Sequence, residues 1–178
     1  NAVVEEAVKV MSDKAVQANV SIVCTLNESL PAVRGTNLFQ VFCNLIKNAI
    51  DAMPDGGTLT VSTRLAGREV LIGFEDTGIG LPEEMDRIFD PFFTTKPPGK
   101  GTGLGLAVCK DIIEKYNGSI EPRRRPSGGS SFTVRIPLES FMPARPWPFS
   151  AAGPRPAGKP AAARPPAGVP AGPEDRKE

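Results

Sequence analysis

The stretch that most constrains this chain is NLFQVFCNLIKNAIDAM at positions 37–53, because it has two opposite faces if it is helical. Five polar side chains then fall on one narrow arc at about 100° per residue, namely Gln40, Asn44, Lys47, Asn48 and Asp51. The apolar side chains fall on the other side, which must pack against other elements. Asn is a poor helix former, so two carboxamides four residues apart indicate a function for the polar face.

The segments around this helix alternate between helical and strand-like patterns. Helical spacing of apolar residues predicts helices over 5–19, 38–53 and 104–116. Strand-like patterns occur at 20–26, 58–64, 70–75 and 131–136, and the second and third read as a hairpin joined across 66–67. Residues 81–98 are expected to be irregular. The mixture predicts an α/β (α+β) fold, a two-layer sandwich with helices on one face of a mixed sheet.

Composition divides the 178 residues into two parts. Residues 1–141 carry 15 Lys+Arg and 17 Asp+Glu, a net charge of −2, which gives no general reason to expect nucleic-acid binding. Residues 142–178 contain 10 Pro, 9 Ala and 4 Gly with 6 basic and 3 acidic residues, too few apolar side chains to offset the entropy of ordering. We therefore expect one domain over 1–141 followed by a disordered tail.

Cysteine and histidine usage narrows the chemistry. The three cysteines have no CxxC spacing, which indicates neither a metal site nor a disulfide framework and fits a reducing cytoplasm. The chain has no histidine, so its chemistry must use carboxylates, amides, lysines and bound metal. No apolar run is long enough to cross a bilayer. The first residue is Asn, so we expect a piece of a longer protein. Whether its upstream part contains a membrane segment is left open by this sequence.

A first glycine turn, DTGIG at 76–80, follows an apolar strand. One interpretation is a strand-ending turn in which Asp76 caps its own backbone. The other is a ligand site, because a carboxylate fixed at a strand end accepts a hydrogen bond from an exocyclic amine such as that of adenine. Gly78 and Gly80 would let the backbone approach the ring closely.

A second glycine turn, GTGLGL at 101–106, opens the helix at 104–116. Free N–H groups and the positive end of the helix dipole can hold phosphate there. The turn fits neither a Walker loop, which needs a hydroxyl residue directly after its lysine, nor a dinucleotide fingerprint, which follows a strand. Between the turns lies FDPFFTTKPPGK at 89–100, which reads as a lid or as a surface loop whose phenylalanines fill the core. Lys96 and Lys100 lie close to the phosphate turn in sequence, which is one reason to expect that they contact a phosphate. The alternative is that both are merely solvated, as loop lysines usually are.

The order and spacing of these elements resemble the ATP-binding domain of sensor histidine kinases, in the superfamily that also holds gyrase, Hsp90 and MutL. The resemblance covers nearly all of 1–141 and implies the Bergerat-type ATP-binding fold. Residues 44–49 resemble the N box, 76–80 the first glycine box, 89–93 the F box and 101–105 the second glycine box. The wording NLIKNAIDAM, DTGIGLP, FFTTK and GTGLGLAVCK is most similar to nitrogen-regulation and PAS-linked kinases.

The resemblance also implies roles for individual residues. The catalytic set is Asn44, Asn48 and Lys96, in which Asn48 would ligate a Mg²⁺ that bridges the triphosphate of ATP while the other two approach the phosphates. The nucleotide-binding set is Asp76, which would bind the adenine amine, with Gly78, Gly80, Lys100, Gly101, Thr102, Gly103, Leu104, Gly105 and Ser131. Hydrolytic relatives carry a glutamate base at position 44, and a carboxamide cannot accept that proton.

The expected activity is transfer of the ATP γ-phosphoryl group to a histidine on a separate dimerisation domain absent from this chain. That domain and a response regulator are the expected partners, and a homodimer would form only through the upstream domain. The chain departs from the family in its basic segment EPRRRP at 121–126 and in its tail. The alternatives are a stand-alone ATPase or serine kinase of the same superfamily, and a non-catalytic ATP-sensing or docking module.

Overall fold

The computed structural model describes residues 1–30, 37–97, 99 and 101–141, and their elements belong to one compact unit. The helices are α1 (Ala2–Gln17), α2 (Leu38–Asp51) and α3 (Gly105–Glu114), with short 3-10 turns at Met85–Arg87 and Leu138–Phe141. The strands are β1 (Val20–Leu26), β2 (Gly57–Ala66), β3 (Glu69–Asp76), β4 (Ser119–Arg124) and β5 (Ser130–Pro137).

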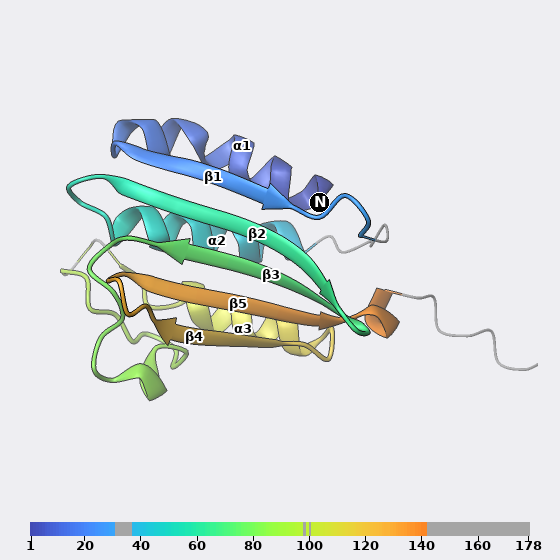
Figure 1. The fold of residues 1–178 in the computed structure, drawn as a ribbon. Helices are drawn as coiled ribbons and strands as arrows, with labels where there is room; N and C mark the ends of the chain where they lie inside the picture. Colours follow the sequence, from blue (N-terminus) through green and yellow to red (C-terminus); the bar gives the residue numbers. More distant parts are fainter. Residues whose placement is uncertain (31–36, 98, 100, 142–178) are drawn as a thin grey trace, which may run out of the picture. The chain divides into compact units, whose positions relative to one another are not determined.

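The five strands form one mixed sheet in the order β1-β2-β3-β5-β4. The β1–β2 pair is parallel, and the other three pairs are antiparallel. Figure 1 shows α1, α2 and α3 on the same face of this sheet. The predicted two-layer sandwich is therefore confirmed, and β3 lies at its centre between β2 and β5.

The core lies between this face of the sheet and the helices. Along β5 the even-numbered residues from Ser130 to Ile136 are buried, whereas their odd-numbered neighbours are partly exposed, as expected for side chains that alternate between the two faces. On α2 the apolar side predicted from the sequence is buried, and the Phe42 ring lies 5.8 Å from that of Phe74, centroid to centroid. Each fully buried large apolar side chain contributes about 1.5–3 kcal/mol. Packing of this side orients the polar stripe of α2.

The structure differs from several of the predicted elements, and α2 ends at Asp51 rather than at 53. The first helix spans Ala2–Gln17 rather than 5–19, and Met85–Arg87 is a 3-10 turn inside a segment expected to be irregular. Strand β4 was not predicted, because Pro122 and two arginines mask its pattern. A proline is tolerated there because β4 pairs with β5 alone and is an edge strand.

Helix α3 spans Gly105–Glu114 rather than 104–116, and the predicted closing turn at 117–118 follows it. Asn117 has a left-handed φ of 50°, and the Gly118 N–H donates to the Ile113 carbonyl at 3.0 Å. Within the described ranges, no helix is both long and apolar enough to span a bilayer. The tail expected at 142–178 lies outside the described residues.

Candidate nucleotide site

A cavity of about 680 Å³ lies between the polar stripe of α2, the end of β3 and the start of α3. Small-molecule sites typically enclose about 300–1,000 Å³. The cavity is lined both by apolar side chains, including Ile88 and Phe132, and by polar side chains of α2, of the end of β3 and of the loop before α3. Its walls thus come from segments that lie far apart in the sequence.

Asp76 ends β3 and is 2% exposed. Its Oδ1 accepts from the Gly78 N–H at 2.9 Å and from the Ser130 N–H at 3.1 Å, while Oδ2 accepts from the Ser130 hydroxyl. These bonds fix the carboxylate in the cavity wall and leave Oδ2 with capacity for one more donor. The Arg125 guanidinium donates to the Asp76 carbonyl at 2.6 Å, which ties the β4–β5 turn to the same point.

The turn after Asp76 packs directly on the end of α2. The Ile79 N–H donates to the Ala52 carbonyl at 2.9 Å, and a Cβ on Gly78 would collide with that carbonyl oxygen. Gly80 has a φ of 84°, which favours glycine. The two glycines therefore allow the strand end and the helix end to meet at one wall of the cavity.

Two carboxamides of α2 belong to the wall of the same cavity. Asn44 Nδ2 donates to the Gly105 carbonyl at 3.4 Å, which links α2 to the first residue of α3. Asn48 Oδ1 lies 3.5 Å from Lys96 Nζ. Both carboxamides line the cavity, as does Asp51 one turn further along the helix.

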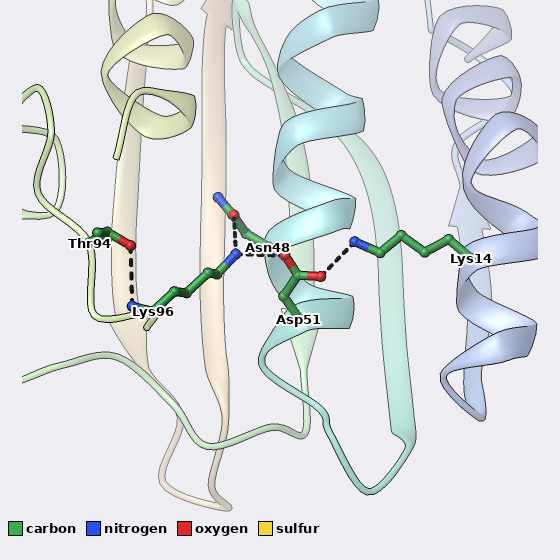
Figure 2. A network of polar contacts seen from close by, with 5 residues as sticks. All are labelled: Lys14, Asn48, Asp51, Thr94 and Lys96. Atoms are coloured by element: carbon green, nitrogen blue, oxygen red, sulfur yellow. Dashed lines mark hydrogen bonds and ion pairs between the residues drawn. The ribbon is translucent and has the colours of Figure 1, made fainter. Parts of the chain in front are cut away.

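Asp51 joins two lysines from different parts of the chain, as Figure 2 shows. Its Oδ1 lies 2.6 Å from Nζ of Lys14 on α1, and its Oδ2 lies 2.6 Å from Nζ of Lys96. Burial raises the pKa of Asp51, but hydrogen bonds and charge from the two ammonium groups outweigh it, so the pKa is lower than usual. Asp51 is therefore held as a carboxylate.

The second glycine turn lies between the loop that carries Lys96 and helix α3. Gly103 has a φ of 66°, and a Cβ there would collide with the backbone of Phe92, whose N–H donates to the Gly103 carbonyl at 3.0 Å. Among the described residues, no side chain caps the start of α3. Uncapped N–H groups at a helix start favour an anionic group.

The phenylalanine loop divides its rings between core and solvent. Phe89 and Phe93 pack against the core, as one interpretation of the sequence expected, and the Arg87 guanidinium lies 5.0 Å from the Phe93 ring centroid. Phe92 is 75% exposed. The loop is thus anchored on both sides of Phe92 and carries Thr94 and Lys96 into the cavity wall.

Comparison with known proteins identifies this arrangement. The model of the family described as histidine kinase-, DNA gyrase B- and HSP90-like ATPases matches residues 34–140. The chain belongs to this ATPase family. Within the family it is similar to the catalytic domain of the histidine kinase ThkA, at 32% identity and a TM-score of 0.69 over 78% of this chain and 93% of that one.

A further relative and a second structure of ThkA place this ATPase domain in longer proteins. Sporulation kinase C of Bacillus subtilis is 35% identical over 144 residues, which are 79% of this chain and 33% of that protein. ThkA in complex with its response regulator TrrA is 28% identical with a TM-score of 0.67, over 80% of this chain and 41% of that one. The chain thus spans about a third of the length of the curated relative.

Most of the predicted site residues of this ATPase line the one cavity. They are Asn44, Asn48, Asp76, Gly80, Lys96, Gly101, Thr102, Gly103 and Gly105. Gly78 and Leu104 lie beside the cavity, where Gly78 packs on α2 and the Leu104 N–H bonds to the Thr102 hydroxyl at 3.4 Å. Lys100 lies outside the described residues.

Ser131 is not among the lining residues, and its neighbour Ser130 takes that place. Successive side chains of a strand point to opposite faces, so one position decides which serine meets Asp76. Ser130 was not among the predicted site residues. The alternation of apolar and polar residues along β5 would have indicated that Ser130 lies on the buried face. The partnership of Asp51 with both lysines was also not predicted, and the sequence carries no local signal for it.

Proposed function

We propose that this chain is the catalytic part of a sensor histidine kinase, which binds ATP and transfers its γ-phosphoryl group to a histidine on a separate domain. One observation carries the proposal. A fixed carboxylate, two carboxamides and an uncapped helix start all border one cavity. These groups suit, in turn, an adenine amine, a metal-bound triphosphate and a phosphate.

Asp76 is assigned to the adenine. Its carboxylate is buried and fixed by three hydrogen bonds, which leaves one acceptor position for an exocyclic amine. The Ser130 hydroxyl is the second polar group at this end of the cavity. A buried acceptor rejects a ligand that lacks the matching donor, so this end selects for an amino-purine.

The phosphate end is assigned to Asn44, Lys96 and the turn at 101–105. Asn44 stands where hydrolytic members of the superfamily carry a glutamate base, and its carboxamide cannot accept a proton from water. Transfer to a separate nucleophile then depends on positioning and on charge stabilisation, which phosphoryl transfer generally permits. This residue favours a kinase over a rapid hydrolase.

A magnesium ion is assigned to Asn48. In the part of the chain that the structure describes, no three His, Cys, Asp or Glu side chains gather as a metal cage. Mg²⁺ fits the site nevertheless, because it usually takes one or two protein oxygens and completes its shell with water and substrate phosphates. When bound it neutralises charge on the β- and γ-phosphate oxygens. Asn48→Ala should therefore weaken ATP binding with Mg²⁺ present and change it little in chelator, as calorimetry would show.

The histidine acceptor and the response regulator must be supplied by other domains or chains. This chain contains no histidine, so it cannot phosphorylate itself on that residue. The complex of ThkA with TrrA supports a response regulator as a partner for a protein of this kind. We therefore place both partners outside residues 1–178.

The decisive experiment mixes the chain with a histidine-bearing dimerisation domain from the same protein and ATP labelled at the γ-phosphate. We expect an acid-labile, base-stable phosphoryl group on that domain. The matched control replaces the acceptor histidine with alanine and should remain unlabelled. Binding of ATP without labelling of any acceptor would contradict the kinase and favour a nucleotide-sensing module.

A further inference from the structure

Asp51 is shared between two ammonium groups that approach it from opposite sides of α2 (Figure 2). Both ion pairs have N–O distances of 2.6 Å, and the Asp51 side chain is 22% exposed. Lys96, the residue assigned to the phosphates, is therefore paired with the Asp51 carboxylate. It must exchange a carboxylate for a phosphate when ATP binds.

We propose that Asp51 and Lys14 are positioning residues that set phosphate affinity through Lys96. Asp51 competes with the phosphates for the Lys96 ammonium, and Lys14 weakens that competition from the far side of α2. The inference rests on the proposed binding of ATP in this cavity.

The charges explain the direction of each effect. Asp51 attracts Lys96, whereas the Lys14 ammonium repels it and offsets the charge of the carboxylate. When Lys96 leaves for a phosphate, Lys14 remains on Asp51, so the half-buried carboxylate keeps a partner. Without Lys14 the departure of Lys96 would leave that carboxylate unpaired, which is unfavourable.

Lys14 acts at a distance from the nucleotide. It lies in the last turn of α1, and the described residues that line the cavity include none from that helix. A substitution at Lys14 therefore tests the shared carboxylate rather than a direct contact. A substitution at Lys96 would change the direct phosphate contact and the ion pair with Asp51 at the same time.

The first test compares Lys14→Met with Lys9→Met, which removes the same charge from an exposed position on α1. The Kd for ATP is measured by calorimetry in the presence of a chelator. Because the chelator removes Mg²⁺, only protein groups then interact with the phosphates. We expect Lys14→Met to raise the Kd for ATP by about fivefold, the effect of one partly exposed ion pair. Lys9→Met should leave the Kd unchanged, and Lys14→Arg should restore the wild-type value.

Adenosine serves as the probe for a merely structural effect. It fills the adenine end of the cavity and carries no phosphate, so its Kd should be the same in the wild type and all variants. A loss of adenosine binding in Lys14→Met would show a damaged site and would contradict the inference.

The second test uses Asp51→Asn, which keeps the shape of the side chain and removes its charge. We expect ATP to bind about fivefold more tightly, because Lys96 is released and a negative charge near the phosphates is lost. In the Asp51→Asn background, Lys14→Met should have no further effect. A persistent effect there, or weaker ATP binding by Asp51→Asn alone, would overturn the inference.

The outcomes separate the two proposals. If the folded wild-type chain bound no ATP with or without Mg²⁺, the proposed function and this inference would both fail. If it bound ATP but Lys14→Met and Lys9→Met gave equal Kd values, only the role of the shared carboxylate would be refuted.

Discussion

Asp76→Asn is the sharpest test of the adenine end of the cavity. The substitution keeps the shape of the side chain, and the remaining carbonyl oxygen can still accept from the Gly78 and Ser130 N–H groups. The Ser130 hydroxyl, which donates to Oδ2 in the wild type, can turn to accept from the new amide. Folding should therefore survive. The lost feature is the free acceptor position, where an amide N–H₂ would now face the adenine amine.

The magnitude follows from the kind of bond that is lost. A hydrogen bond to a charged group contributes about 1.5–3 kcal/mol, and Asp76, at 2% exposure, has little water to replace it. At about 1.4 kcal/mol per factor of ten, the Kd for ATP should rise roughly 10- to 150-fold. The neighbouring turn contacts should hold the rest of the cavity unchanged.

Calorimetry with ATP and Mg²⁺ would measure this change, with thermal melting of the same samples to confirm folding. Asp55→Asn is the matched control. It removes the same charge from an exposed carboxylate in the turn between α2 and β2. Equal affinities for wild type and Asp76→Asn, with both folded, would refute the adenine assignment.

Three further predictions concern the framework of the site. Gly78→Ala should lower the free energy of unfolding by about 1–3 kcal/mol, seen as a lower Tm, because its Cβ would meet the Ala52 carbonyl oxygen. Burial raises the pKa of the Cys109 thiol to about 11, so iodoacetamide at pH 8 should modify exposed Cys24 first, and mass spectrometry should find Cys109 modified only after unfolding. The lowered pKa of Asp51 means that its ionised form stabilises the fold above its unfolded pKa, near 3.8, and that this contribution is lost as pH falls through the lower folded value. The Tm of the wild type should therefore drop more steeply on acidification below about pH 4 than that of Asp51→Asn, and parallel curves would contradict the ion pairs.

Periodicity within one segment was enough to predict much of the fold and the α2 wall of the cavity. The helical period of 38–53 placed Asn44 and Asn48 on the polar side and its apolar residues in the core, as the structure confirms. The strand before Asp76 and the left-handed turn at Asn117 after α3 were also predicted from local patterns. Each of these signals depends only on residues near one another in the sequence.

Features that depend on tertiary contacts could not be predicted in this way. Two adjacent serines begin β5. The alternation along the strand indicates that Ser130 is the buried one, but only the pairing of β5 with β3 shows that it meets Asp76. Lys14 reaches Asp51 across 37 positions, and nothing in the sequence of α1 distinguishes it from other exposed lysines. Strand β4 was not predicted, since a strand that contains Pro122 is tolerated only at a sheet edge, and the edge position of β4 is a property of the whole sheet.

The two ends of the cavity are built in different ways. Asp76 ends the central strand and is held by two backbone N–H groups and the Ser130 hydroxyl, whereas among the described residues the Lys96 ammonium bonds to the side chains of Asp51 and Asn48. An inhibitor that occupies only the adenine end would thus meet a template of fixed shape. One that extends toward Lys96 would have to displace an ion pair, and related kinases with different partners for that lysine would respond to it differently. Selective compounds should accordingly be sought by growing a purine-like fragment in that direction.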